Sequence, residues 1–144
     1  MIHLQLVTLT GTKFDDDVYE VILPTLDGQI GVLPGHMPLV SVATNGVIEV
    51  RRDAKDPDSA REFYATSGGV IDVEGDKLRV LVDEADHADE INEAEAEAAH
   101  QRAMQLKKEA KDEVSLEKAQ ALLDRSAVRL QVAQIRRRHS GRRQ

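Results

Sequence analysis

The chain has 144 residues, 41% of them hydrophobic, which suits one small domain with an appendage. Its formal net charge of −7 argues against nucleic acid as a partner. It has no cysteine, which excludes disulfides, thiol nucleophiles and Cys-based zinc sites. No run approaches the ~18 consecutive apolar residues that span a membrane, so we expect a soluble protein.

The first part of the chain has the pattern of many short strands. Apolar and polar residues alternate over Ile2–Leu9 and again over Val18–Leu23, where Pro24 is expected to end the strand. Gly-containing turn pairs separate the runs at regular intervals, which is typical of an antiparallel β-sandwich or barrel. The predicted hairpin turns are Asp27-Gly28, Asn45-Gly46 and Gly75-Asp76.

A tight corner is predicted in the glycine-rich stretch from Gly28 to Leu39. Pro34 presets φ and Gly35 can adopt φ > 0, so residues 33–36 are expected to form a type II turn. Because Pro38 favours an extended residue before it, the chain should leave this corner as a second strand.

The second part, from about residue 84, is expected to be helical. Glu84–Asp89 has the composition of a polar linker. Asn92 with Glu95 forms a capping-box pattern for a first helix, and Ser115 is the predicted N-cap of a second. The connection between them is short, which predicts an antiparallel helical hairpin. The apolar stripe of the second helix is predicted to comprise Leu116, Ala119, Leu123, Ala127, Leu130 and Ala133.

The predicted fold class is therefore α+β: an N-terminal antiparallel β-sandwich over residues 1–84, then an antiparallel two-helix hairpin with a basic tail over residues 85–144. The second helix has few large apolar residues along its length. Burying each gives about 1.5–3 kcal/mol, against an ordering cost of about 1–2 kcal/mol per residue. We therefore expect the hairpin to dock weakly on the sandwich, so that a partner could shift it.

No catalytic or metal-binding pattern is found in the sequence. Gly28-x-x-Gly31 lacks the Gly-Lys-Ser/Thr of a phosphate loop, and no Gly-x-Ser-x-Gly elbow occurs. The acidic run Asp83–Glu97 lacks the glycine and oxygen spacing of a calcium loop. The basic cluster Arg136–Arg143 suits an acidic protein surface or plain solvation better than nucleic acid. We therefore expect a protein that is not an enzyme.

Two segments resemble the signatures of one known family. Residues 26–40 (LDGQIGVLPGHMPLV) closely resemble the first signature of the epsilon subunit of F-type ATP synthases, in its bacterial form. Residues 67–73 (SGGVIDV) resemble the second, a Ser-Gly-Gly before an apolar strand. The order of sandwich and helical hairpin is similar as well.

This resemblance implies a non-catalytic rotor subunit in the central stalk of a proton-translocating ATP synthase. The sandwich would join the c-subunit ring to gamma, and the helices would extend toward the catalytic alpha and beta subunits to inhibit ATP hydrolysis. The protein would be peripheral, at the cytoplasmic face of the inner (plasma) membrane. By position, Asp27, Gly28 and Gln29 would face the c ring, Pro34, Gly35 and His36 would lie near gamma, and Arg136, Arg137 and Arg138 would meet an acidic segment of beta.

Some members of this family bind ATP on the folded hairpin, and no other cofactor is required. In those members the family's motif is Ile/Leu-Asp-x-x-Arg-Ala. At the corresponding residues 114–119 (VSLEKA) the Asp is replaced by Ser115 and the Arg by Lys118. Lys118, Arg125 and Arg129 remain candidate phosphate contacts, although Lys lacks the planar fork of Arg. The alternative hypotheses are a free-standing protein-binding module of the same architecture and an enzyme with its site on the sheet.

Overall fold

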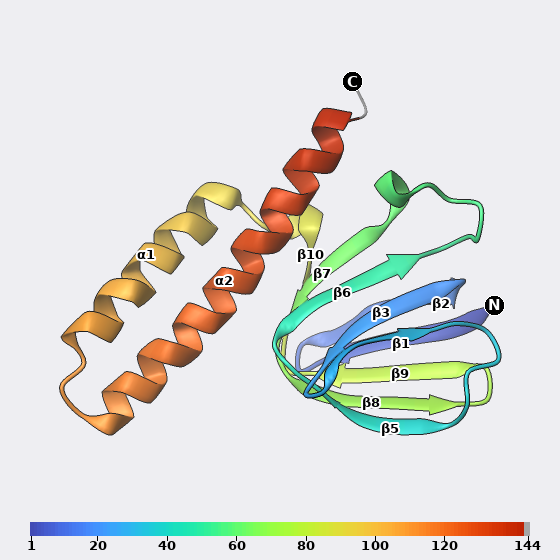
Figure 1. The fold of residues 1–144 in the computed structure, drawn as a ribbon, viewed down its shortest axis with the longest axis horizontal. Coiled ribbons are helices and arrows are strands. Elements are labelled where there is room, and N and C mark those ends of the chain that lie inside the picture. Colours follow the sequence, from blue (N-terminus) through green and yellow to red (C-terminus); the bar gives the residue numbers. More distant parts are fainter. Residues whose placement is uncertain (143–144) are drawn as a thin grey trace.

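The computed structural model describes the backbone of residues 1–142 and the side chains of residues 1–138, and it confirms a β-sandwich followed by two helices (Figure 1). The strands are β1 (Ile2–Thr8), β2 (Gly11–Val18), β3 (Glu20–Thr25), β4 (Gly28–Val32), β5 (Leu39–Ala43), β6 (Gly46–Arg51), β7 (Glu62–Thr66), β8 (Gly69–Glu74), β9 (Lys77–Val82) and β10 (Ala85–His87). The helices are α1 (Glu93–Glu109) and α2 (Glu113–Arg142), with short 3-10 turns η1 (Asp58–Ala60) and η2 (Ala88–Glu90).

The strands form two layers joined at one corner. One layer has the order β4-β3-β6-β7-β10 and the other β5-β8-β9-β1-β2, and the single pair Thr25–Ala43 connects β3 to β5. Pairing is antiparallel except between β1 and β9, which run parallel. We call the two layers the helix-side sheet and the open sheet, because only the first is covered by the helices.

Two turn predictions were wrong. Pro24 does not end β3, which continues through it to Thr25, with Pro24 opposite Gln29 of β4. Asn45-Gly46 is not a hairpin turn: β5 pairs with β8 while β6 pairs with β3 and β7, so the chain crosses between layers there. A side chain at Gly46 would meet Pro24 at 2.7 Å, so glycine serves close packing at this crossing.

The core lies between the two layers and follows the alternation of the strands. In β1 every second residue is buried, and Leu4 and Leu6 are wholly inaccessible while the polar residues between them face outward. The same cluster takes residues from both sheets, including Leu23, Ile48 and Leu78. Aliphatic side chains dominate it, in keeping with the 3% aromatic content of the chain.

The segment predicted to be a linker contains a strand. Ala85–His87 forms β10, which pairs antiparallel with residues Thr66 to Tyr64 of β7. Ala85 is buried in the sandwich core although its neighbours are polar. The prediction was wrong because one buried alanine between acids gives too weak an alternation to be recognised in the sequence. As a result, the helix-side sheet continues right up to the helices.

The helix starts follow from local capping. The carboxamide oxygen of Asn92 accepts a hydrogen bond from the N–H of Glu95 at 3.0 Å, which confirms the predicted N-cap of α1. The predicted cap of α2 was wrong by three residues. Asp112 accepts from both the backbone N–H of Ser115 (2.7 Å) and its hydroxyl (3.1 Å), so Ser115 lies in the first turn.

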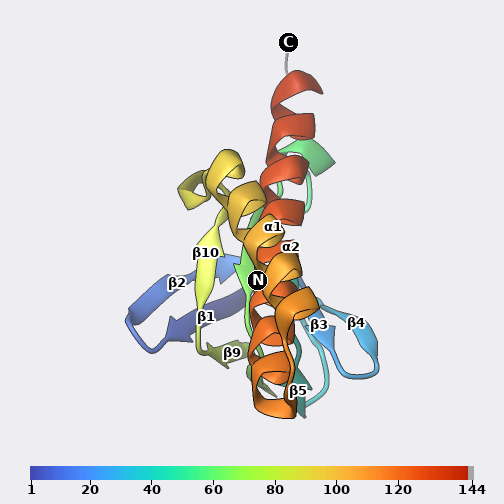
Figure 2. The same cartoon turned by 90° about the vertical axis from the view of Figure 1, so that its left-hand side faces the viewer.

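The helices form an antiparallel hairpin, and only the second half of α2 rests on the sandwich (Figures 1 and 2). Val132 and Ala133 are fully buried against Phe63, Ala65 and other residues of a second apolar cluster. The predicted stripe was partly wrong. Leu116 and Ala127 are exposed, while Ser126 and Val132 are buried. The first half of α2 packs chiefly against α1, and its apolar residues Leu116 and Leu122 stay exposed.

Candidate interaction surfaces

The predicted c-ring loop is the tip of the β3–β4 hairpin. The turn residues are Leu26 and Asp27, and Gly28 and Gln29 already belong to β4. Gly28 has φ +113°, a conformation that favours glycine, and its carbonyl accepts a hydrogen bond from the Thr25 hydroxyl at 2.6 Å. Leu26 is 72% exposed at this tip. The hairpin therefore presents an apolar side chain next to the uncharged Gln29.

The predicted gamma-facing corner is formed as expected. Gly35 has φ +86°, and the N–H of His36 donates to the carbonyl of Leu33 at 3.1 Å, which closes the type II turn. A ring nitrogen of His36 lies 2.6 Å from the Met37 carbonyl, so the side chain of this histidine forms a hydrogen bond within the loop. The corner and the hairpin tip lie at opposite ends of β4, about 16 Å apart at 3.3 Å per residue.

The largest feature that the sequence interpretation missed is on the outer face of the open sheet. Val42, Val70, Leu81 and Val7 are consecutive cross-strand neighbours on β5, β8, β9 and β1. We call these four residues the aliphatic row. Val42, Val70 and Leu81 are about half exposed, and Val40 beside them is 74% exposed. The signal in the sequence was that these strands have apolar residues on both faces, and one face then has no cover within the chain.

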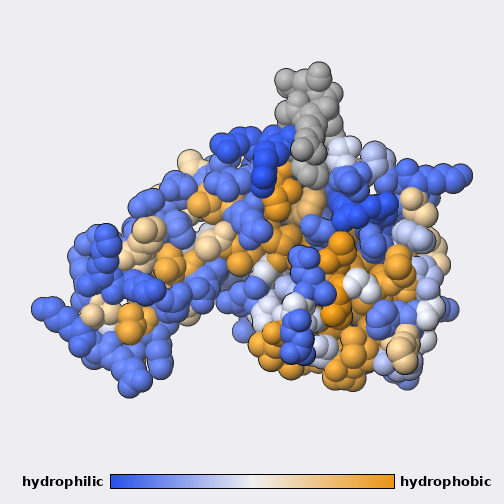
Figure 3. Space-filling model, viewed as in Figure 1, coloured by the Kyte–Doolittle hydropathy of each residue, from blue (hydrophilic) through white to orange (hydrophobic). Residues whose placement is uncertain are grey.

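Charged pairs cover the rest of this face. Asp72 is opposite Arg79, Glu74 is opposite Lys77, and His3 is opposite Asp17. The outer face therefore changes from aliphatic at one end to charged at the other. Seen from the side of Figure 3, apolar surface gathers over the sandwich, whereas the helical hairpin is mostly hydrophilic.

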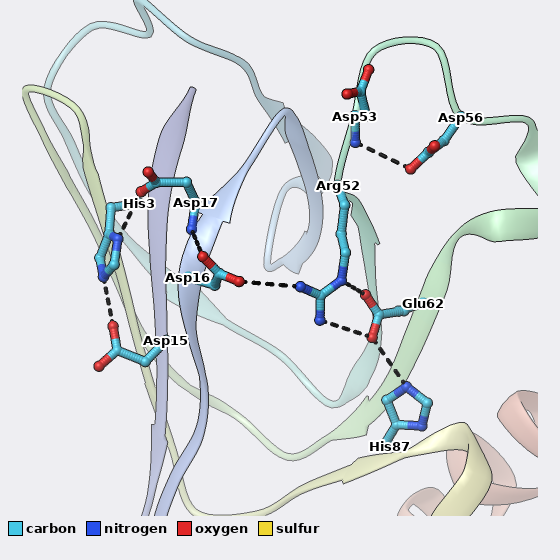
Figure 4. Close-up of polar contacts among 9 residues, drawn as sticks. All are labelled: His3, Asp15, Asp16, Asp17, Arg52, Asp53, Asp56, Glu62 and His87. Carbon is cyan, nitrogen blue, oxygen red and sulfur yellow. Dashed lines mark hydrogen bonds and ion pairs between the residues drawn. The ribbon is translucent and has the colours of Figure 1, made fainter.

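His3 lies between two aspartates of β2. Its ring nitrogens are 2.8 Å from a carboxylate oxygen of Asp17 and 2.5 Å from one of Asp15 (Figure 4). These hydrogen bonds, that to Asp17 first, raise the pKa of His3 above 6.5. A second chain of contacts closes the edge of the sandwich: Asp16 of β2 meets Arg52, Arg52 meets Glu62, and Glu62 meets His87 of β10 (Figure 4).

Aromatic rings pack against the residues of this second network. Arg52 lies over the ring of Phe14 at 4.7 Å, and Tyr64 stands edge-on to both Phe14 and His87. Burial raises the pKa of Tyr64 to about 12. Within the described side chains, His, Asp and Glu nowhere form a group of three suited to holding a metal ion. The two networks thus tie strands together.

Four arginines among the described side chains of α2 contact other parts of the chain. Arg125 pairs with Glu84 at 2.7 Å and Arg129 pairs with Asp86 of β10. Arg136 donates to the carbonyl of Ala88 at 2.7 Å, and Arg137 pairs with Glu93 at 3.0 Å. Arg138 is exposed. The basic residues 142 and 143 of the predicted cluster lie outside the described side chains. Arg125, Arg129 and Arg136 therefore lie along one seam with residues 84–88, whereas Arg137 contacts the start of α1.

The three predicted phosphate contacts do not share one cavity. Arg125 and Arg129 line a cavity of about 420 Å³ between α1 and α2. Lys118 lines a separate one nearer the hairpin turn. Arg102 and Glu95, which the sequence interpretation did not single out, also line the first cavity. The carboxylate of Glu95 thus lies in the cavity where binding of a phosphate group would need positive charge.

Comparison with known proteins gives the family. Residues 1–88 match the family described as ATP synthase, Delta/Epsilon chain, beta-sandwich domain, and residues 89–134 match its long alpha-helix domain. Relatives named ATP synthase epsilon chain include one from Herpetosiphon aurantiacus, 36% identical over 137 residues, covering 94% of this chain and 96% of the relative. Another, from Chloroflexus aggregans, is 37% identical over 142 residues, covering 96% and 99%.

The fold has a counterpart among solved structures. A chain in the cryo-EM structure of the Euglena gracilis mitochondrial ATP synthase, OSCP/F1/c-ring, superposes with a TM-score of 0.78 at 23% identity, covering 92% of this chain and 80% of that one. Fold and sequence together define the class: a chain made of a β-sandwich domain and a long α-helical domain. The chain belongs to the ATP synthase delta/epsilon chain family, as its two signatures predicted. Its function is that of an epsilon-type subunit of an ATP synthase.

Among residues 1–142, neither helix combines the length and the apolar character that crossing a bilayer requires.

Proposed function

We propose that the chain is a rotor subunit in the central stalk of a proton-translocating F-type ATP synthase, at the cytoplasmic face of the inner membrane. In this role the sandwich joins gamma to the c ring, and the helical hairpin restrains ATP hydrolysis. The observation that carries the proposal is the aliphatic row on the open sheet. The outer face of a largely antiparallel sheet in a free-standing domain is commonly polar throughout, whereas one end of this face is aliphatic.

The open sheet is the surface that we assign to gamma. Burying exposed aliphatic area gives about 25 cal/mol per Å², so the row favours a partner over water. The 33–36 corner leads directly into this face, because Met37, which is 75% exposed, is followed within three residues by Val40. The corner and the row therefore form one continuous surface.

The c ring is assigned to the tip of the β3–β4 hairpin. The uncharged Gln29 offers no ionic contact, and the exposed Leu26 offers an apolar one. Because the tip and the corner lie at opposite ends of β4, the sandwich can hold two partners at once. A stiff aliphatic core between them suits the transmission of torque.

A substitution on the aliphatic row tests the assignment to gamma. We expect Val70→Arg to weaken binding of purified gamma at least about tenfold, because a charge at the centre of an apolar interface is left unpaired. The matched control is Lys77→Glu, which reverses a charge at the other end of the same face. Isothermal titration measures both variants. Equal affinity of Val70→Arg and the unsubstituted chain would contradict the assignment.

The hairpin is assigned the regulatory role. In the extended state Arg136, Arg137 and Arg138 would meet an acidic segment of a catalytic beta subunit, after Arg136 and Arg137 leave the contacts described above. Replacing all three by Ala should relieve inhibition of ATP hydrolysis most at low ionic strength, where charge attraction is least screened. Unchanged inhibition at every ionic strength would exclude this contact.

ATP is not required for this function, and we propose at most a regulatory role for it on the folded hairpin. The cavity between α1 and α2 has the room, but two of its arginines, Arg125 and Arg129, already pair with Glu84 and Asp86. We expect isothermal titration of the isolated chain with ATP to give weak binding. Tight, saturable binding would show this expectation to be wrong.

A further inference from the structure

The seam between α2 and β10 has the form of a receptor that holds a ligand. Arg125, Arg129 and Arg136 lie on one side of α2, at spacings of four and seven residues, and we call them the arginine face. All three contact a single short stretch of chain, at Glu84, at Asp86 and at the carbonyl of Ala88. The contacted positions recur at every second residue.

The first of these spacings on α2 matches the first spacing on the contacted stretch. Four residues of helix advance about 6 Å, from Arg125 to Arg129. Two residues of strand advance about 6.6 Å, from Glu84 to Asp86. The guanidinium groups of Arg125 and Arg129 are therefore spaced like two successive outward side chains of an extended strand, whereas Arg136 lies a further seven residues along α2 and meets a backbone carbonyl. A helical ligand would turn about 200° over two residues, so it would present only one of two such carboxylates.

The strand alternates as this geometry requires. Ala85 is buried in the sandwich, whereas Glu84 and Asp86 point to α2 and His87 turns away to Glu62. The pattern that the arginine face contacts is thus acid-x-acid in an extended backbone. The two ion pairs use only the carboxylates of Glu84 and Asp86, so they do not depend on the identity of the residue between them.

The pairs are open to exchange. Arg125 and Glu84 are each about half exposed, and the Arg129 and Asp86 side chains are 28% and 27% exposed. A cavity of about 220 Å³ adjoins both pairs and is lined by all four of these residues. Neither charge is sealed from water, so another carboxylate can reach the arginines as this one leaves.

We propose that the arginine face is a binding surface for an extended acidic segment of a partner protein, with carboxylates two residues apart, and that β10 is its internal ligand. An external segment of this kind competes with β10 and thereby releases α2. The inference deepens the regulatory role proposed above and rests on it only in that α2 can leave the sandwich. The partner segment differs from an acidic helix in its required spacing.

The test uses a blocked peptide with the sequence of residues 82–90 (VDEADHADE), added to the full chain. In the unsubstituted chain the internal strand competes at an effective concentration of about millimolar, so binding should be weak. In the double variant Glu84→Gln/Asp86→Asn this competition is lost, and we expect affinity to rise at least about tenfold. A peptide with the same two amide replacements should bind this variant at least about tenfold more weakly.

Two further reagents test the spacing and the receptor. A helical peptide with the same number of acids placed four residues apart should bind no better than the amide peptide. Adding Arg125→Gln/Arg129→Gln to the double variant should abolish binding. The matched control chain is Glu74→Gln/Asp76→Asn, in the β8–β9 turn far from α2, and it should behave as the unsubstituted chain. Equal binding of the acidic and amide peptides would overturn the proposal.

A distance measurement keeps the test decisive if the double variant does not fold. The chain has no cysteine, so spin labels can be placed at Lys77→Cys and Gln131→Cys, both on exposed positions of an otherwise unsubstituted chain. The acidic peptide should lengthen the distance between them in a growing fraction of molecules, and the amide peptide should not. An unchanged distance at saturating peptide would overturn the proposal. Neither readout involves ATP hydrolysis, so failure here leaves the proposed inhibition to be judged separately.

Discussion

At the scale of single residues, two positions show how local chemistry sets stability. His3 bridges two aspartates of the neighbouring strand on the exposed outer face, where each contact is open to solvent. Gly69, in contrast, lies where the backbone of β8 packs closely against the backbone of β9. A side chain there would lie 1.9 Å from the carbonyl oxygen of Leu81 on β9. One residue responds to pH, and the other permits strand pairing.

The pKa of His3 gives a pH-dependent prediction. Because the folded-state pKa is raised above 6.5, its contribution to stability is complete below pH 6.5 and is lost as pH rises through the raised value. Replacing Asp15 and Asp17 by Asn should lower the His3 pKa toward 6.5 in an NMR titration. Urea unfolding should show a larger cost of this replacement at pH 6 than at pH 9. A cost that grows with pH would refute the sign.

Gly69→Ala should destabilise the sandwich by about 1–3 kcal/mol or more, since neither β8 nor β9 can yield without loss of pairing. The matched control is Gly31→Ala on β4, where an added side chain meets nothing within 4 Å. Chemical denaturation compares the two. Equal midpoints would mean that β8 and β9 are farther apart in solution than the structure has them.

At the scale of elements, α2 is held by different means along its length. Its start is fixed by Asp112, whose pKa is lowered by the hydrogen bonds from Ser115. Its first half packs against α1, where a ring nitrogen of His100 lies 3.4 Å from the hydroxyl of the buried Ser126, and Arg125 there also pairs with Glu84. Its second half is fastened to the sandwich by Val132 and Ala133, by the ion pair of Arg129 with Asp86 and by the hydrogen bond of Arg136 to Ala88. The docked segment is thus short and partly ionic.

Val132→Ala should therefore loosen the hairpin selectively. Removing two buried methyl groups costs about 1–3 kcal/mol, and the loss falls on the smaller cluster that joins α2 to β6 and β7. Hydrogen exchange should speed up in α1 and α2 while amides of β1 and β9 keep their protection. Uniform acceleration across both sheets would indicate that hairpin and sandwich unfold as one unit.

At the scale of the whole molecule, two apolar clusters and two opposed faces organise the chain. The larger cluster lies wholly between the sheets, and the smaller one joins the helices to one of them. The opposite sheet face has the aliphatic row uncovered. The sandwich can thus keep its shape while the hairpin moves, because the contacts that move are outside the main core.

This division predicts a difference in salt response. Raising sodium chloride from low ionic strength to about 0.5 M screens the partly exposed pairs Arg125–Glu84 and Arg129–Asp86 but does not affect the aliphatic core. The spin-label distance between positions 77 and 131 should lengthen in part of the population, while the unfolding midpoint of the sandwich stays nearly constant. If salt left the distance unchanged, apolar packing alone would be holding α2.

The sequence by itself determined much of this protein. Alternation in strands such as β1, the turn at Pro34-Gly35, the cap at Asn92 and the two family signatures are local patterns, and local sterics and hydrogen bonding decide them. Tertiary structure alone decided which strands pair, since Asn45-Gly46 has the composition of a hairpin turn whichever layer the next strand joins. It also decided which groups the arginines of α2 contact. Charge and spacing showed that Arg125 and Arg129 could bind anions, but only the fold placed Glu84 and Asp86 opposite them, because that contact joins residues more than forty positions apart.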